Sequence, residues 1–273
     1  MSAGSKYSKI RTMKDKKSLD HAIVRPPSLN FAEGLTTGDL GAPDYQRALE
    51  QHEAYCEALE QCGLKLICLD ADGRYPDSTF VEDAAVLTKS CALITRPGAP
   101  SRLGEVSSIA EQLAKFYRDI HPVTEPGTLD GGDVCEAGNH FFIGISERTN
   151  EAGAQQLVEI LTTLGYTASC VDVRGLKSIL HLKSGVAYLG ENRLLVIEAL
   201  ANRAEFLGYD VIRVNAGEEY AANCVRVNDR ILVAAGYPEL EGRLKELGYE
   251  MIALKMSEFQ KMEGGLSCLS LRF

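Results

Sequence analysis

A unit of about fifty residues recurs along this 273-residue chain, and it constrains the fold more than any other feature. Each unit begins with two short apolar runs joined by a polar turn, a pattern that predicts a β-hairpin. The turns fall at 89–90, 138–139, 191–192 and 228–229. A hairpin this short cannot bury its apolar face alone, so the units are expected to pack against one another.

Helical patterns follow most of the hairpins, and a further short apolar run follows most of the helices. The clearest helix is predicted over 44–63, where Tyr45, Leu49 and Cys56 recur at helical spacing and Gly63 closes the pattern. Weaker helical patterns cover 104–117, 150–164 and 240–247, and single strands are predicted over 65–69, 168–173, 211–214 and 250–254.

The unit is complete about five times if the last apolar run, 266–271, pairs with the first, 22–24. Pairing the first and last strands closes a ring and removes an exposed sheet edge. The repeat therefore predicts a closed radial array of α/β units. An ordinary mixed α/β sandwich is the alternative architecture.

Composition narrows the class of protein. The chain is 45% hydrophobic and 25% charged, as in ordinary globular proteins, and its net charge of −9 argues against a nucleic-acid binder. No apolar run approaches the roughly 18 residues of a membrane span. The eight cysteines form no C-x-x-C pair, which disfavours zinc ribbons and redox dithiols. A reducing, cytoplasmic location is expected.

The first 18 residues differ from the rest of the chain. They are rich in lysine and arginine, with Asp15 as the acidic residue among them, and they show little apolar periodicity. This pattern predicts a disordered basic tail over 1–18 and a single α/β domain over 19–273.

One polar position recurs at the head of the first strand in each unit. The residues at this position are Glu82 with Asp83, Asp130, His181, Asn223 and Cys268. Taken singly, each has an ordinary explanation, such as a turn cap, a satisfied core histidine or a packed thiol. In a radial fold, however, equivalent strand heads converge at one end of the axis. The shared register therefore predicts a common pocket.

A thiol, an imidazole and carboxylates in one pocket suit nucleophilic attack on a planar cation. Carboxylates match the forked donors of a guanidinium, and each such contact is worth about 1.5–3 kcal/mol. A free thiol is only a few per cent ionised at neutral pH, but positive charge on His181 or on a bound substrate favours the thiolate. Cys268 is thus the candidate nucleophile and His181 its acid/base partner.

Six segments of the chain resemble motifs of the dimethylarginine dimethylaminohydrolases, a family of the guanidine-modifying, or pentein, superfamily. The segments follow the family's order, and the resemblance covers about residues 20–273. They are 76–83, 94–99, 128–133, 180–184, 221–224 and 264–268. The resemblance implies a five-bladed α/β propeller with pseudo-five-fold symmetry, in agreement with the repeat.

The resemblance also implies a reaction. Nω-methylated arginine (asymmetric dimethylarginine or monomethylarginine) would be hydrolysed to citrulline and dimethylamine or methylamine, with no cofactor and no metal. Cys268 would form a covalent thiouronium intermediate, His181 would act as acid and then base, and Asp130 would hold the imidazole. The partner is then a small-molecule substrate, neither nucleic acid nor membrane, and a homodimer is common for this kind of enzyme.

Substrate-binding residues follow from the same resemblance. Asp83 and Glu82 would bind the guanidinium nitrogens, and Arg102 and Arg148 the substrate carboxylate. Asp77 and the Leu35 backbone would meet the α-amine, with Leu35 on a loop similar to the family's mobile lid. Without the resemblance, both arginines would be interpreted as surface charges near helix starts.

Two departures leave the substrate preference open. Asp130 stands where bacterial relatives often have glutamate, and Glu263 stands where aspartate is expected. The alternatives are an arginine deiminase or citrulline hydrolase of the same fold, or a non-catalytic propeller that binds a macromolecule. The last has no need for a thiol beside a histidine.

Overall fold

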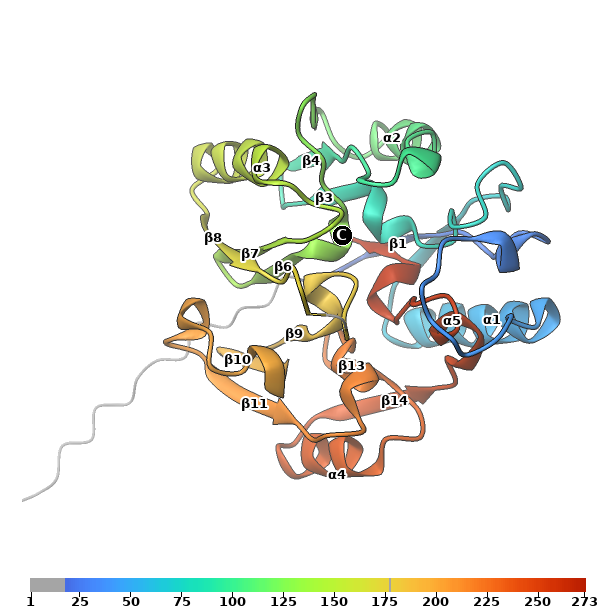
Figure 1. Ribbon diagram of the computed structural model, residues 1–273, viewed down its shortest axis with the longest axis vertical. Coiled ribbons are helices and arrows are strands. Elements are labelled where there is room, and N and C mark those ends of the chain that lie inside the picture. The colour runs from blue at the N-terminus through green and yellow to red at the C-terminus, as the bar shows by residue number, and fades with distance from the viewer. Residues whose placement is uncertain (1–17, 177) are drawn as a thin grey trace, which may run out of the picture.

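The computed structural model describes residues 18–176 and 178–273. Within them, five three-stranded sheets stand around a common axis like the blades of a propeller (Figure 1). The closed radial array predicted from the repeat is therefore confirmed. The predicted basic tail falls almost wholly on residues 1–17, outside the described residues. None of the described helices is long and apolar enough to cross a membrane.

Every blade has the same strand arrangement. Two strands pair antiparallel, joined as a hairpin in four of the blades, and a third strand pairs in parallel with the middle strand. In chain order the blades are β3 (Ala85–Leu87), β4 (Cys91–Ile94) and β5 (Asp119–Pro122); β6 (Val134–Ala137), β7 (His140–Ile145) and β8 (Thr167–Asp172); β9 (Val186–Gly190), β10 (Arg193–Ile197) and β11 (Asp210–Val214); β12 (Val225–Val227), β13 (Arg230–Ala234) and β14 (Glu250–Leu254); and β15 (Leu271–Arg272), β1 (His21–Val24) and β2 (Lys65–Cys68).

The parallel pairings explain the helices, because a parallel strand can be reached only by a crossover connection. Four blades use an α-helix for this crossover, and Figure 1 shows these helices on the outside of the ring. They are α1 (Tyr45–Gln61), α2 (Val106–Leu113), α3 (Glu151–Thr163) and α4 (Pro238–Glu246). The blade of β9, β10 and β11 uses two 3₁₀ turns instead, consistent with the weak helical pattern there. A short helix, α5 (Ser257–Gln260), packs beside α1.

The middle strand of each blade is buried on both faces. In β10 the run Leu194, Leu195, Val196 and Ile197 is almost completely inaccessible, and β7 and β13 show the same continuous burial. Such a strand lies between neighbouring blades and covering elements. Its sequence is therefore an unbroken apolar run, without the alternation of polar and apolar residues that marks a half-exposed strand.

Pairing of the chain's two ends closes the ring, as predicted. In β1, Ile23 lies opposite Leu271 of β15 on one side and Ile67 of β2 on the other. The closing strand is shorter than predicted, however. It contains Leu271 and Arg272 alone, and Cys268 precedes it in a 3₁₀ turn.

The five polar positions expected at strand heads lie in or beside short 3₁₀ turns. These turns are η2 (Val81–Ala84), η4 (Gly131–Asp133), η5 (Leu182–Ser184), η8 (Glu219–Ala222) and η9 (Ser267–Leu269). The expectation of a strand at Cys268 was wrong because three residues are too few to separate alternation from a turn. An i+3 hydrogen bond from the Cys268 amide to the Gly265 carbonyl, 3.2 Å long, stabilises the turn. Each of the five positions nevertheless lies just before the first strand of its blade.

Strand β5 was not predicted from the sequence. Its residues are Asp119, Ile120, His121 and Pro122, of which only Ile120 is apolar and favours strands. The strand lies at the edge of its sheet. An edge strand with a largely solvated surface needs no apolar pattern, so hydrophobic periodicity could not reveal it.

We predict that ring closure is a major source of stability. Ile23 is fully buried in the middle strand that joins β15 to β2. Ile23→Ala should lower the free energy of unfolding in urea by about 2–5 kcal/mol, because it removes a buried side chain and leaves a cavity. Leu29→Ala is the control, since Leu29 is 82% exposed, and it should change stability by less than about 0.5 kcal/mol. Equal effects of the two substitutions would contradict this role.

Candidate active site

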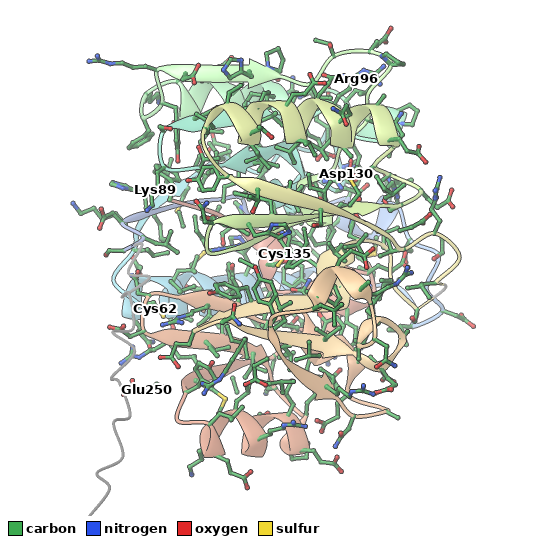
Figure 2. All side chains as sticks on the ribbon, turned by 90° about the vertical axis from the view of Figure 1, so that its left-hand side faces the viewer. Cys62, Lys89, Arg96, Asp130, Cys135 and Glu250 are labelled. Carbon is green, nitrogen blue, oxygen red and sulfur yellow. The ribbon has the colours of Figure 1, made fainter. Side chains whose placement is uncertain are left out.

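Two cavities lie along the propeller axis. The larger, of about 1020 Å³, is lined by hairpin residues including Lys89 and by Cys62 and Cys135. In Figure 2, Lys89 and Cys62 lie at one end of the axis, Cys135 near its middle, and Asp130 toward the other end. The smaller pocket, of about 20 Å³, contains Cys268 and His181 in its wall. Most of the predicted site residues surround this second pocket, namely Leu35, Asp77, Asp83, Arg102, Arg148, His181 and Cys268.

His181 is held by Asp130 from the adjacent blade. Its Nε2 lies 3.0 Å from Asp130 Oδ2, and the Gly98 amide donates to Asp130 Oδ1 at 2.9 Å. Asp130 is completely buried. Burial alone lowers the pKa of His181, but the charges of Asp83, Asp133 and Asp130 outweigh burial and raise that pKa to about 9. The imidazole is therefore protonated at neutral pH.

Asp83 supplies an ionised carboxylate beside the imidazole. Its Oδ1 accepts from the Gly132 amide at 2.9 Å, and its Oδ2 accepts from Arg102 Nη1 at 2.7 Å. Burial raises the pKa of Asp83, but the charges of His181 and Arg102 more than offset burial and hold that pKa at about 2. This carboxylate therefore stays negative although it is buried.

Arg102 borders the pocket, but its guanidinium already has protein partners. It donates to Asp83, to both carboxylate oxygens of Glu105, and to the carbonyls of Asp77 and Phe80. The sequence-based expectation was a cation available for the substrate carboxylate. The structure instead places Arg102 as the partner that neutralises Asp83 and Glu105.

Arg148, unlike Arg102, has a guanidinium nitrogen that no described residue binds. Its Nη1 is buried and has no hydrogen-bond partner among the described residues. Arg148 also lines the pocket, and its backbone lies so close to Gly98 that a side chain at Gly98 would collide with it. A buried donor without a partner is costly, so this nitrogen is suited to bind an anion.

Cys268 is buried and lines the same pocket. Its Sγ accepts a weak hydrogen bond from the Gly265 amide at 3.4 Å. Burial raises the pKa of the Cys268 thiol to about 12, and the negative charges of Glu82 and Asp83 act in the same direction. The thiol is therefore neutral at neutral pH. Gly264 and Gly265 let this turn pack directly on Phe80 and Asn223, where any Cβ would collide.

The loop that carries Leu35 closes over the pocket. The Leu35 amide donates to both oxygens of Asp77 at 3.1 Å, and burial raises the pKa of Asp77. Two residues further on, the Thr37 amide and hydroxyl donate to the Glu263 carboxylate at 2.7 and 2.9 Å. Glu263 therefore joins this loop to the segment that leads into Cys268.

Glu82 does not share the pocket with Asp83. Its carboxylate lines the larger cavity and pairs with Lys183 Nζ at 2.7 Å and Arg272 Nη2 at 2.9 Å. Glu82, expected to bind the guanidinium beside Asp83, is thus placed toward the other cavity. Adjacent residues on a 3₁₀ turn point in different directions, so one carboxylate faces each cavity.

A closed belt of hydrogen bonds around the axis links the five turns. Each bond joins one blade to the next, and the last joins the fifth blade to the first. The bonds run from the Gly132 amide to Asp83 Oδ1 (2.9 Å), from the Leu182 amide to Asp133 Oδ1 (2.9 Å), from Asn223 Nδ2 to the Lys183 carbonyl (3.1 Å), from the Ser267 amide to Asn223 Oδ1 (2.9 Å), and from Ser267 Oγ to Glu82 Oε2 (2.7 Å).

Sequence reasoning did not single out three charged residues around the site. Asp133 is fully buried and accepts hydrogen bonds from Leu182, Ser146 and Thr149, although it lies within the motif 128–133. Glu105 follows Arg102 by three residues, a spacing that suggests an ion pair. Lys183 lies two residues after His181 but on the side of the larger cavity.

Asp83, Asp130 and His181 bring three potential metal-ligating atoms close together. Their atoms are already engaged, because Asp83 pairs with Arg102 and Asp130 pairs with a protonated His181. A cation here would have to displace both pairs. The donor set therefore fits an acid/base group better than a metal centre.

The five-bladed α/β propeller, with a thiol, an imidazole and a buried aspartate near its axis, is characteristic of the pentein superfamily. A family profile described as "N,N dimethylarginine dimethylhydrolase, eukaryotic" matches residues 42–210. The chain belongs to the dimethylarginine dimethylaminohydrolase family.

Individual relatives agree with this assignment. The chain is 45% identical to the N(G),N(G)-dimethylarginine dimethylaminohydrolase of Pseudomonas aeruginosa, over 93% of this chain and 99% of that protein. It is 39% identical to the Streptomyces coelicolor protein of the same name, over 92% and 96% of the two chains. A solved structure of the Pseudomonas aeruginosa enzyme, a cysteine-to-serine mutant complexed with citrulline, matches with a TM-score of 0.91 at 44% identity, covering 94% of this chain and all of that one.

We predict that Asn223 couples the His181 and Cys268 turns. Asn223→Ala leaves the buried Ser267 amide without its acceptor, so the free energy of unfolding in urea should fall by about 1–3 kcal/mol. Asn202→Ala is the matched control, because Asn202 is exposed and bonds one arginine side chain, and it should change stability by less than about 0.5 kcal/mol. An unchanged free energy of unfolding in Asn223→Ala would show that the bonds of Asn223 in the belt do not stabilise the fold.

Proposed function

We propose that this protein hydrolyses Nω-methylated arginine to citrulline and a methylamine. The observation that carries the proposal is the arrangement around one pocket of a neutral buried thiol (Cys268), a protonated imidazole (His181) and an ionised carboxylate (Asp83). The names of its relatives support this reaction in particular, and so does the citrulline bound to the Pseudomonas aeruginosa mutant.

Recognition of the guanidinium begins at Asp83. Its two oxygens each accept one bond from the protein, and a carboxylate has about four acceptor sites, so both oxygens can still accept from a planar cation. The substrate carboxylate pairs with Arg148, whose Nη1 has no partner among the described residues. The Leu35 carbonyl and Asp77 receive the α-amine. These two ends orient the substrate between Asp83 and Arg148.

The bound cation then activates the nucleophile. A positive guanidinium beside Cys268 opposes the effect of burial and lowers the pKa of the thiol from about 12, so substrate binding favours the thiolate. The thiol releases its proton to solvent and the resulting thiolate attacks the guanidinium carbon. His181 then donates its own proton to the dimethylamine nitrogen as the C–N bond breaks. A covalent thiouronium remains on Cys268.

The second half of the reaction regenerates the enzyme. His181 is now neutral, and it takes a proton from water as the water attacks the thiouronium carbon. The C–S bond breaks, citrulline is released, and both the thiol and the imidazolium are restored. Asp130 stabilises the imidazolium at both stages and fixes the ring through Nε2.

Substrate binding requires the pocket to open. A volume of about 20 Å³ accommodates roughly one water molecule, far less than an arginine derivative. The loop with Leu35 and Thr37 is fastened by polar contacts to Asp77 and Glu263, and Leu35 is 40% exposed. We infer that this loop is the lid, because water can replace its polar contacts to Asp77 and Glu263 as it opens.

A single catalytic domain over 19–273, a cytoplasmic location and a homodimer stay predictions.

We predict that Cys268→Ser abolishes turnover and leaves the fold intact, because a hydroxyl is far less acidic than the thiol it replaces. Release of citrulline and dimethylamine from asymmetric dimethylarginine measures turnover, and circular dichroism checks the fold. Monomethylarginine, arginine and citrulline should be compared in the same assay. Persistent activity in Cys268→Ser would overturn the nucleophile, and a preference for arginine would favour a deiminase.

We predict that Arg148→Ala acts on binding more than on chemistry. Loss of a charge-assisted contact worth about 1.5–3 kcal/mol should raise KM about 10- to 100-fold, with kcat within a few-fold of wild type. Arg96→Ala is the control, because Arg96 pairs with the exposed Glu125 outside the pocket. A large fall in kcat at unchanged KM would contradict the role of Arg148.

A further inference from the structure

A second cluster of metal-ligating side chains lies away from the active site, on the outer part of the blade of β3, β4 and β5. Cys91 Sγ, an Asp119 carboxylate oxygen and a His121 ring nitrogen all lie within 4.8 Å of one another. His121 Nε2 is 2.8 Å from Asp119 Oδ1. None of these residues lines either of the two axial cavities described above.

Strand register produces this cluster. Cys91 lies directly opposite Asp119 in the parallel pair of β4 and β5, and His121 is two residues beyond Asp119. Residues two apart on a strand share a face, so both polar side chains project beside the thiol. Ile120, between them, belongs to the opposite face and packs against the core. The alternation along β5 thus separates two potential ligands from the one apolar contact.

The Cys91 backbone is fixed by hydrogen bonds, whereas the Asp119 and His121 side chains can rotate. Cys91 is 1% exposed, and Thr88 fixes its backbone from both sides, by accepting from the Cys91 amide at 3.0 Å and donating to the Cys91 carbonyl. The side chains of Asp119 and His121 are about half exposed, at 54% and 46%. Two of the three ligands are therefore accessible to a metal ion from solvent.

The geometry of the cluster fits a tetrahedral ion after small side-chain movements. Zinc bonds to sulfur at about 2.3 Å and to nitrogen or oxygen at about 2.0–2.2 Å, which places tetrahedral ligand atoms roughly 3.3–3.7 Å apart. His121 Nε2 and Asp119 Oδ1, 2.8 Å apart, are closer together than this range, and Cys91 Sγ lies within 4.8 Å of a ligand atom of each. Rotation of the two exposed side chains is enough to reach it.

The donor set selects the metal. Magnesium and calcium prefer oxygen ligands alone, whereas one thiolate, one imidazole and one carboxylate suit a borderline-soft ion such as Zn²⁺. We propose that Cys91, Asp119 and His121 form a zinc site with water as the fourth ligand, which ties edge strand β5 to β4. The ion binds the thiolate, so the Cys91 proton is released to solvent on binding.

The site is independent of the hydrolytic reaction, so its test needs no activity measurement. The full chain carrying Cys268→Ser is the parent protein, because that change removes the catalytic thiol as a competing ligand. After chelation and desalting, Co²⁺ is added as a spectroscopic substitute for Zn²⁺. We expect about one equivalent bound, with a thiolate-to-cobalt charge-transfer band in the near ultraviolet that added Zn²⁺ bleaches.

Stability gives a second readout. Binding to the folded state alone at 100-fold excess over Kd should raise Tm by about 5 °C or more. Cys91→Ser in the parent should lose both the band and the Tm shift, whereas Cys170→Ser, which changes an exposed cysteine on β8, should keep both. His121→Ala, at an exposed position that tolerates substitution, should weaken Zn²⁺ binding at least 10-fold, and His140→Ala on β7 should not.

Two results would overturn the site. The first is a parent protein that gives no thiolate band and no Tm shift with either metal, which would leave Cys91 a buried thiol under a surface His–Asp pair. The second is an unchanged band in Cys91→Ser, which would assign the metal to another cysteine.

Discussion

The hydrogen-bonded belt around the axis is the constraint on which the rest of the structure depends. Its members are immediate or near neighbours of the residues that face the pocket: Glu82 beside Asp83, Leu182 beside His181, and Ser267 beside Cys268. Each bond satisfies a buried polar group that would otherwise cost about 1–3 kcal/mol. The same bonds that satisfy the backbone at the crowded axis therefore set the positions of the catalytic groups contributed by different blades.

Charge is distributed about the belt so that the two axial cavities differ. On the pocket side, Asp83 stays ionised and His181 stays protonated because each stabilises the other's charge. On the other side, Glu82 is neutralised by Lys183 and Arg272. The result is a small pocket with one strong anionic position, next to a thiol whose pKa of about 12 keeps it neutral. A cation is thus both the ligand that this pocket attracts and the charge that its thiol lacks.

Much of this could be predicted from the sequence, and the failures have physical causes. The repeat revealed the blades because buried middle strands such as β10 are continuous apolar runs. Strand β5 was missed because its face is polar. The register of His181, Asn223 and Cys268 identified the axis, but residue spacing does not encode side-chain direction. The direction of Glu82 toward the larger cavity was therefore not foreseen. Nor were the partners of Arg102, which are set by tertiary contacts to Asp83 and Glu105.

The pairing of β1 with β15 has a consequence for how the molecule assembles. Ala22 lies opposite Arg272, so the blade that carries Cys268 is built from the two most distant parts of the described chain. The other four blades are contiguous in sequence, and their shorter loops cost less entropy to close. We expect the composite blade to form last, since contacts of high sequence separation are slow to establish. Catalytic competence would then arise only in a fully folded molecule, and folding intermediates would carry no assembled nucleophile.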